Sequence, residues 1–212
     1  MFAIIQAAGW PIWPLLIASV IAMALIIERL IMLRRFRIVP AGLLENAVAA
    51  YQKQGITPEL IAKLAHDSPL GQVLAAGLRN TKSSRYVMKE SIEEAGRAVT
   101  HELERFLTTL GTIASISPLM GLFGTVVGMI EIFGSQSPTG TNPQILAHGI
   151  SVALYNTGFG LVIAIPATIF FRHFRGTVES FVVEMEQQAS KLVDIVHGER
   201  SDYAGSSQQP RS

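Results

Sequence analysis

The chain has 212 residues, of which 49% are hydrophobic and 16% charged, and its mean hydropathy is +0.37. The formal net charge is only +1, and the absence of cysteine excludes disulfides, thiolate metal sites and cysteine nucleophiles. Three long segments, 2–27, 106–130 and 132–171, contain no Lys, Arg, Asp or Glu. Because about 20 apolar residues are enough to cross a bilayer, these segments predict an integral membrane protein.

The positive charges are distributed unevenly along the chain. No Lys or Arg occurs before Arg29 or between Arg105 and Arg172. Since loops rich in Lys and Arg stay in the cytoplasm, the pattern predicts a periplasmic N-terminus and a cytoplasmic C-terminus. The same bias explains the basic segment 34–37, so we expect a lipid bilayer as partner and no nucleic acid. The predicted fold class is an all-α integral membrane protein with three transmembrane helices and long cytoplasmic helical extensions.

The predicted parts follow one another without an internal repeat or a phosphate-binding loop. In chain order they are a periplasmic N-terminus (1–9), a first membrane helix (10–33), a cytoplasmic helical segment (34–105), a second membrane helix (106–133), a periplasmic loop (134–146), a third membrane helix (147–171), a cytoplasmic amphipathic helix (172–200) and a disordered tail (201–212).

The large cytoplasmic segment contains recognisable helix starts. Thr57 and Ser68 each precede a proline, which is a cap followed by a residue suited to the first helical turn. From Arg85 apolar residues recur at helical spacing, and no helix-breaking residue occurs before Leu110. We therefore expect short helices followed by a long helix that runs unbroken into the second membrane span.

The second and third membrane helices are rich in small residues. Glycine, alanine and serine recur through both, and such residues let helix backbones approach closely within lipid. The basic residues Arg172 and Arg175 are expected to end the third membrane helix at the inner surface. A separate amphipathic helix over Thr177–His197 is expected to follow.

Both of these membrane helices carry extended motifs. Residues 118–130 read Pro-Leu-Met-Gly-Leu-Phe-Gly-Thr-Val-Val-Gly-Met-Ile, and residues 149–161 read Gly-Ile-Ser-Val-Ala-Leu-Tyr-Asn-Thr-Gly-Phe-Gly-Leu, followed by Ile165-Pro166-Ala167. This sequence resembles the MotA/TolQ/ExbB proton channel family, and its three-span layout is most similar to the ExbB/TolQ branch. The resemblance implies a homopentamer around the membrane helices of an ExbD/TolR-like single-span protein, with a TonB/TolA-like protein as a further partner, in the bacterial inner membrane.

The chain departs from the family at one position. ExbB and TolQ normally have a membrane-buried glutamate where this chain has Val152. Valine cannot ionise, so the resemblance implies that proton passage here depends on the partner's acid and on hydroxyl groups. The motor branch also has an apolar residue at this position, so the loss does not by itself abolish ion passage.

Two threonines match the family motifs. Thr125 and Thr157 are candidates for the ion pathway, because hydroxyls can hydrate an ion without adding charge. The alternative is structural, since a threonine in a membrane helix commonly bonds to its own backbone one turn back.

Two further polar residues lie near the centre of the third helix. Tyr155 and Asn156 must find hydrogen-bonding partners there, either between subunits or in the ion path itself. They are the candidates to compensate for the missing glutamate. At the outer helix ends, Glu131 and His148 would form rings at the periplasmic mouth, unless they are simply solvated interfacial groups.

The sequence supports two functions from different classes. The first is an ion-channel-forming subunit, with protons as the expected ion, of a complex that uses the proton motive force to energise transport or envelope processes. The alternative, which Val152 keeps open, is a non-conducting scaffold for partner membrane helices. We expect no enzyme activity, cofactor or metal, because no catalytic set or metal-ligand spacing occurs. Three spans without repeated halves also argue against a small-molecule transporter.

Overall fold

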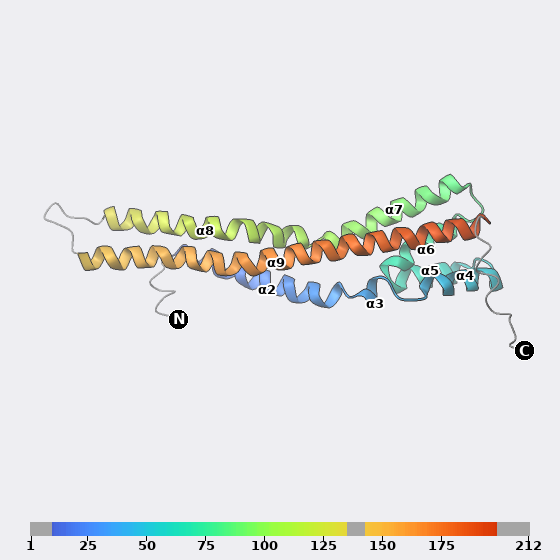
Figure 1. Cartoon of the computed structure of the whole chain (residues 1–212), viewed down its shortest axis with the longest axis horizontal. Helices are drawn as coiled ribbons and strands as arrows, with labels where there is room; N and C mark the ends of the chain where they lie inside the picture. The colour runs from blue at the N-terminus through green and yellow to red at the C-terminus, as the bar shows by residue number, and fades with distance from the viewer. Residues whose placement is uncertain (1–9, 135–142, 199–212) are drawn as a thin grey trace, which may run out of the picture. The chain divides into compact units, whose positions relative to one another are not determined.

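The computed structural model describes residues 10–134 and 143–198, which form helices and turns and contain no strand (Figure 1). The predicted N-terminus 1–9 and tail 201–212, and most of the predicted loop 134–146, lie outside these ranges. The chain divides into two compact units, residues 1–31 with 105–175 and residues 32–104 with 176–212. The all-α class predicted for this chain is confirmed for the described residues.

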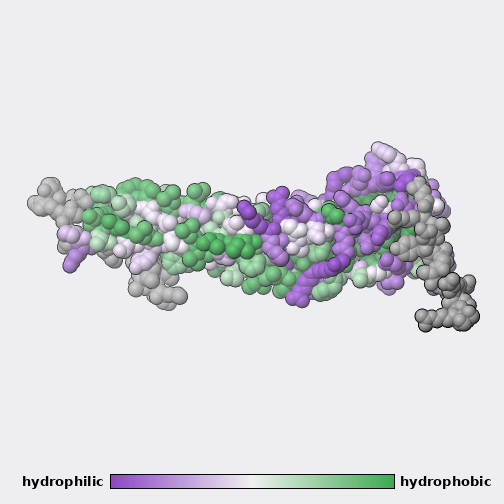
Figure 2. Space-filling model, viewed as in Figure 1, coloured by the Kyte–Doolittle hydropathy of each residue, from purple (hydrophilic) through white to green (hydrophobic). Residues whose placement is uncertain are grey.

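The first unit contains the three apolar helical segments. They are α2 (Ile12–Met32), α8 (Leu107–Gly134) and the first part of α9 (Pro143–Val196). Each belongs to a helix that is long and apolar enough to cross a membrane. Figure 2 shows apolar residues over much of the surface of this unit, and large exposed hydrophobic residues recur along all three helices. Such a surface is stable in lipid rather than in water.

Helix α9 differs from the expectation of a membrane helix followed by a separate amphipathic helix. It is continuous from Pro143 to Val196, through Arg172, Arg175 and Gly176. The expected stop was wrong because basic residues can mark a membrane surface without interrupting backbone hydrogen bonds. An isolated glycine lowers helix stability by only about 1 kcal/mol relative to alanine and does not end a helix on its own.

The prediction of an unbroken helix from Arg85 to Leu110 is also wrong, because two residues within this range are not helical. Helix α7 (Arg85–Glu104) and α8 are separated by a turn at Arg105 and Phe106. Neither glycine nor proline causes the turn. At the turn, the Phe106 ring contacts two guanidinium groups, with its centroid 4.9 Å from Arg29 and 5.1 Å from Arg105.

The second unit packs short helices around α6. Its helices are α3 (Arg35–Ile38), α4 (Leu43–Gln54), α5 (Pro58–Asp67), α6 (Pro69–Arg79), α7 and the last part of α9. Most of α6 is buried, and Leu74 and Leu78 are fully enclosed. Gly77 lets α7 and α9 approach α6, since an added Cβ would lie 2.9 Å from Ile92 and 3.1 Å from Leu192.

The two helix starts predicted from the sequence are confirmed. The Thr57 hydroxyl accepts a hydrogen bond from the Leu60 amide at 3.2 Å, and the Ser68 hydroxyl accepts one from the Gly71 amide at 3.1 Å. Each bond satisfies an amide that has no partner within its helix.

Candidate functional site

The contact between α8 and α9 is built on glycine. A Cβ atom added to Gly160 would lie 2.5 Å from the Ser117 carbonyl oxygen, and one added to Gly121 would lie 2.7 Å from the Asn156 carbonyl oxygen. Any side chain at these positions would push the two backbones apart. The small residues of α8 and α9 therefore let these two helices of one chain pack closely against each other, as expected within lipid.

The order of contacts shows that α8 and α9 are antiparallel. Gly121 meets Gly160, and towards the other end Gly128 meets Ala153, with 3.5 Å between an added Cβ and the alanine Cβ. Gly121 thus lies level with Gly160, and Gly128 lies level with Ala153. This register decides which of the candidate side chains can share a surface.

Asn156 lies inside this contact. Its side chain is 1% exposed and fills the space beside Gly124, where an added Cβ would be 2.8 Å from the amide carbon Cγ. A buried amide in an apolar helix pair must satisfy its hydrogen-bonding groups locally. Within one chain, Asn156 is therefore a packing residue between α8 and α9 rather than a surface residue.

Thr125 and Thr157 lie on one side of the α8/α9 pair. Each is half-buried and directly follows an interface residue, Gly124 in α8 and Asn156 in α9. One residue turns a helix by about 100°, and equal rotations in two antiparallel helices bring the side chains to the same side of the pair. The structure thus places together the two hydroxyls that the motifs singled out.

The Thr125 hydroxyl bonds to its own helix. Its Oγ1 donates to the Leu122 carbonyl oxygen at 2.6 Å, as several other hydroxyls in α8 and α9 donate to the preceding turn. This is the structural role considered for such threonines. The bond uses the hydroxyl proton only, so the oxygen keeps acceptor capacity towards a donor or a hydrated cation.

The residue just before α2 contacts the other side of α8. The Trp10 ring meets the Phe123 ring edge-to-face with centroids 6.1 Å apart. Phe123 precedes Thr125 by two residues, so their side chains diverge by about 200° around the helix. This contact therefore lies on the side of α8 that is turned away from Thr125.

Tyr155 does not join this side. Tyr155 is 42% exposed and lies two residues before Thr157, so it faces away from that threonine. Glu131 is exposed near the end of α8. Val152 and His148 belong to α9, but their side chains lie outside the described residues. The four residues assigned to an ion pathway thus occupy three different faces of one chain.

One charged residue near the end of α2 was not singled out from the sequence. Arg29, which follows Glu28, is only 5% exposed. Its Nε lies 3.3 Å from the Glu28 carboxylate, and its guanidinium stacks over Phe106. Stacking of this kind leaves little of the charge exposed. It could have been suspected from the sequence, because an arginine and an aromatic residue both occur at the same predicted membrane boundary.

Comparison with known proteins identifies the family to which these helices belong. A model of the MotA/TolQ/ExbB proton channel family matches residues 65–187, which include the α8/α9 contact and every candidate residue named above. Biopolymer transport protein exbB1 of Vibrio cholerae is 35% identical over 169 residues, covering 76% of this chain and 73% of the relative. An ExbB-like biopolymer transport protein of Synechocystis is 33% identical over 188 residues, covering 86% and 89%. The Tol-Pal system protein TolQ of Pseudomonas aeruginosa is 31% identical over 159 residues, covering 69% and 66%.

Proposed function

The chain belongs to the MotA/TolQ/ExbB proton channel family, and from this premise we propose that it is the channel-forming subunit of an inner-membrane complex driven by the proton motive force. The observation that carries the proposal is the side of the α8/α9 pair that bears both Thr125 and Thr157 and is turned away from the Trp10–Phe123 contact. A conducting surface needs polar oxygens without permanent charge, and two hydroxyls on one side provide them.

The proposed assembly is a homopentamer around the membrane helix of an ExbD/TolR-like single-span protein. Thr125 and Thr157 of each subunit then face the central helix, whose carboxylate takes up and releases the proton. Glu131 and His148 form rings at the periplasmic mouth. The second unit lies in the cytoplasm, in agreement with the positive charges on its side of the chain, and a TonB/TolA-like protein receives the motion.

The driving force is sufficient for such a role. One elementary charge that crosses the membrane gains about 2.3 kcal/mol per 100 mV. A few protons therefore supply enough free energy to rotate or shift one element of the complex relative to another. The hydroxyls need only lower the cost of moving each proton to and from the partner's acid.

The proposal is tested by reconstitution. The chain is purified from its native membrane with whatever short single-span protein accompanies it, and proton uptake is followed in vesicles with an imposed potential. We expect flux that disappears when the partner's membrane aspartate is replaced by asparagine. Absence of such a partner from every purification, or flux that does not depend on its acid, would contradict the proposal.

A non-conducting scaffold remains the second candidate because of Val152. The position that carries an acid in ExbB and TolQ cannot ionise here. In a scaffold, α8 and α9 would hold partner helices while another subunit conducts. The reconstitution separates these functions, because a scaffold binds the partner but gives the same flux as empty vesicles.

Val152→Glu tests how the chain manages without this acid. We expect flux to be unchanged or reduced, because the surrounding residues are not arranged for an additional carboxylate. Burial in lipid would keep the new acid largely protonated near pH 7, so the variant should still fold. The measurement is proton flux in the reconstituted complex, with Val152→Gln as a control of the same shape. A clear increase in flux for Val152→Glu alone would indicate a channel that has lost its acid.

A further inference from the structure

The second unit has an open groove between α7 and α9. Its volume is about 650 Å³, and its floor is apolar, formed by Val73 of α6 with Ile92 and Met185. Charged residues of both signs stand at its rim, among them Glu93, Arg97 and Glu186. A groove with an apolar floor and a charged rim suits a protein segment that offers an apolar anchor between charges.

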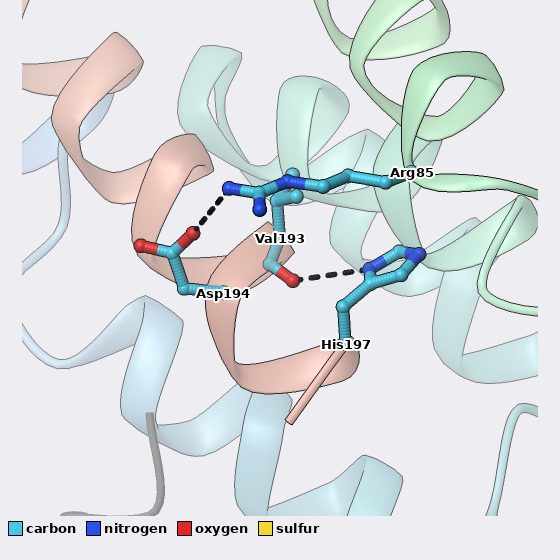
Figure 3. A network of polar contacts seen from close by, with 4 residues as sticks. All are labelled: Arg85, Val193, Asp194 and His197. Atoms are coloured by element: carbon cyan, nitrogen blue, oxygen red, sulfur yellow. Dashed lines mark hydrogen bonds and ion pairs between the residues drawn. The ribbon is translucent and has the colours of Figure 1, made fainter. Parts of the chain in front are cut away.

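Gly96 marks the open centre of the groove. No atom lies within 4 Å of a Cβ added there, although Gly96 lines the groove. One end is closed by Arg85, whose guanidinium donates to the Asp194 carboxylate at 3.0 Å, and beside it His197 Nδ1 donates to the Val193 carbonyl oxygen at 3.2 Å (Figure 3). The space beside Gly96 is therefore open, and the Arg85–Asp194 ion pair joins α7 to α9 near one end of the groove.

This ion pair also fixes the register of the two helices. Gly96 follows Arg85 by eleven residues, and Val183 precedes Asp194 by eleven, so Gly96 lies level with Val183 along antiparallel α7 and α9. Glu93 and Arg97 of α7 and Val182 and Glu186 of α9 all line the groove around this level.

A basic and aromatic patch lies at the same level on the other face of α9. It consists of Arg34, Phe36 and Arg37, all exposed, and the Phe36 ring is 64% exposed. The neighbouring Arg35 binds the Glu184 carboxylate at 2.6 Å, which holds the patch beside Glu184. Val182 and Glu186 line the groove, and each is about 200° around α9 from Glu184. The groove and the Arg35–Glu184 contact that holds the patch thus lie on different faces of α9 at one level.

From this arrangement we propose that the Arg34–Phe36–Arg37 patch of one copy docks in the α7/α9 groove of the next copy. Phe36 fills the open space at Gly96 while the arginines face Glu186 and Glu93 at the rim. Rotation about a ring axis leaves every residue at its height, so two complementary faces at one level can meet in successive copies of a ring when the two faces are inclined to each other and the rotation between copies closes. The inference rests on the proposed function, because it requires the chain to assemble with itself.

Introduced cysteines test this contact directly, since the natural chain has none. In native membranes, Arg37→Cys combined with Gly96→Cys should form disulfide-linked dimers and higher multiples on oxidation. Arg37→Cys with Ala98→Cys is the matched control, because Ala98 is also exposed on α7 but points about 200° away from Gly96. Adding Phe36→Ala to the first pair should lower cross-linking to the level of the control.

The outcomes separate this contact from the assembly as a whole. Native mass spectrometry of the same variants reports whether the chain is oligomeric. Oligomers without cross-linking above the Ala98 control would overturn the proposed contact and leave the channel proposal standing. Cross-linking unaffected by Phe36→Ala would also overturn it, because Phe36 would then serve as a membrane anchor. Loss of all oligomers in the natural chain would contradict both proposals.

Discussion

Replacing Gly160 with alanine is expected to destabilise the first unit, whereas the same change at Gly158 should be neutral or stabilising. The new Cβ at position 160 would lie 2.5 Å from the Ser117 carbonyl oxygen and 3.2 Å from Gly121 Cα. Both are backbone atoms of α8, which cannot move without separating the helices. Overpacking of this kind typically costs about 1–3 kcal/mol. At Gly158 no atom lies within 4 Å, so only the higher helix propensity of alanine, worth about 1 kcal/mol, is felt.

The two variants form a matched pair, because they make the same chemical change two residues apart in one helix. Unfolding of the isolated chain in mixed detergent micelles measures the difference in free energy. Equal stability of the two variants would contradict the close α8/α9 packing. A loss of stability confined to Gly158→Ala would mean that α8 packs against the face of α9 that carries Gly158, and not against the face that carries Gly160.

Local signals in the sequence were sufficient for the helix starts of the second unit. Thr57 and Ser68 each sit before a proline, and each hydroxyl does accept a bond from an amide of the first turn. Caps depend on a few adjacent residues, so the sequence contains the whole cause. The interruption at Phe106 has no glycine or proline to announce it, and one residue stacked on its ring, Arg29, is far away in the chain.

The directions of the side chains in the membrane helices could not be predicted from the sequence. Polar residues near the centre of the third span could be recognised from the sequence, and all of them could be assigned to an ion path. Which of them faces a neighbouring helix depends on the register between α8 and α9. Gly124 leaves the space that Asn156 fills, while Tyr155 points away from it. Only the packed pair contains this information.

Replacing Thr125 and Thr157 together with valine is expected to lower ion-driven flux by about tenfold or more while leaving assembly intact. Valine keeps the β-branched shape of threonine and removes only the hydroxyl. A hydrogen bond to a charged group is worth about 1.5–3 kcal/mol, and 1.4 kcal/mol corresponds to a factor of ten. Folding should be little affected, because the Thr125 hydroxyl donates its hydrogen bond to its own helix, at the Leu122 carbonyl oxygen.

Thr109→Val provides the control for this double variant, since Thr109 is exposed on α8 but turned away from the side that bears Thr125. Proton flux in vesicles and oligomer mass are measured on the same preparations. Reduced flux in the double variant, with normal flux in Thr109→Val, would assign the effect to the side of the α8/α9 pair that bears Thr125 and Thr157. If the double variant conducts normally, the two hydroxyls serve the helix backbone alone. The ion must then follow another face of α9, where Tyr155 would be the next residue to replace.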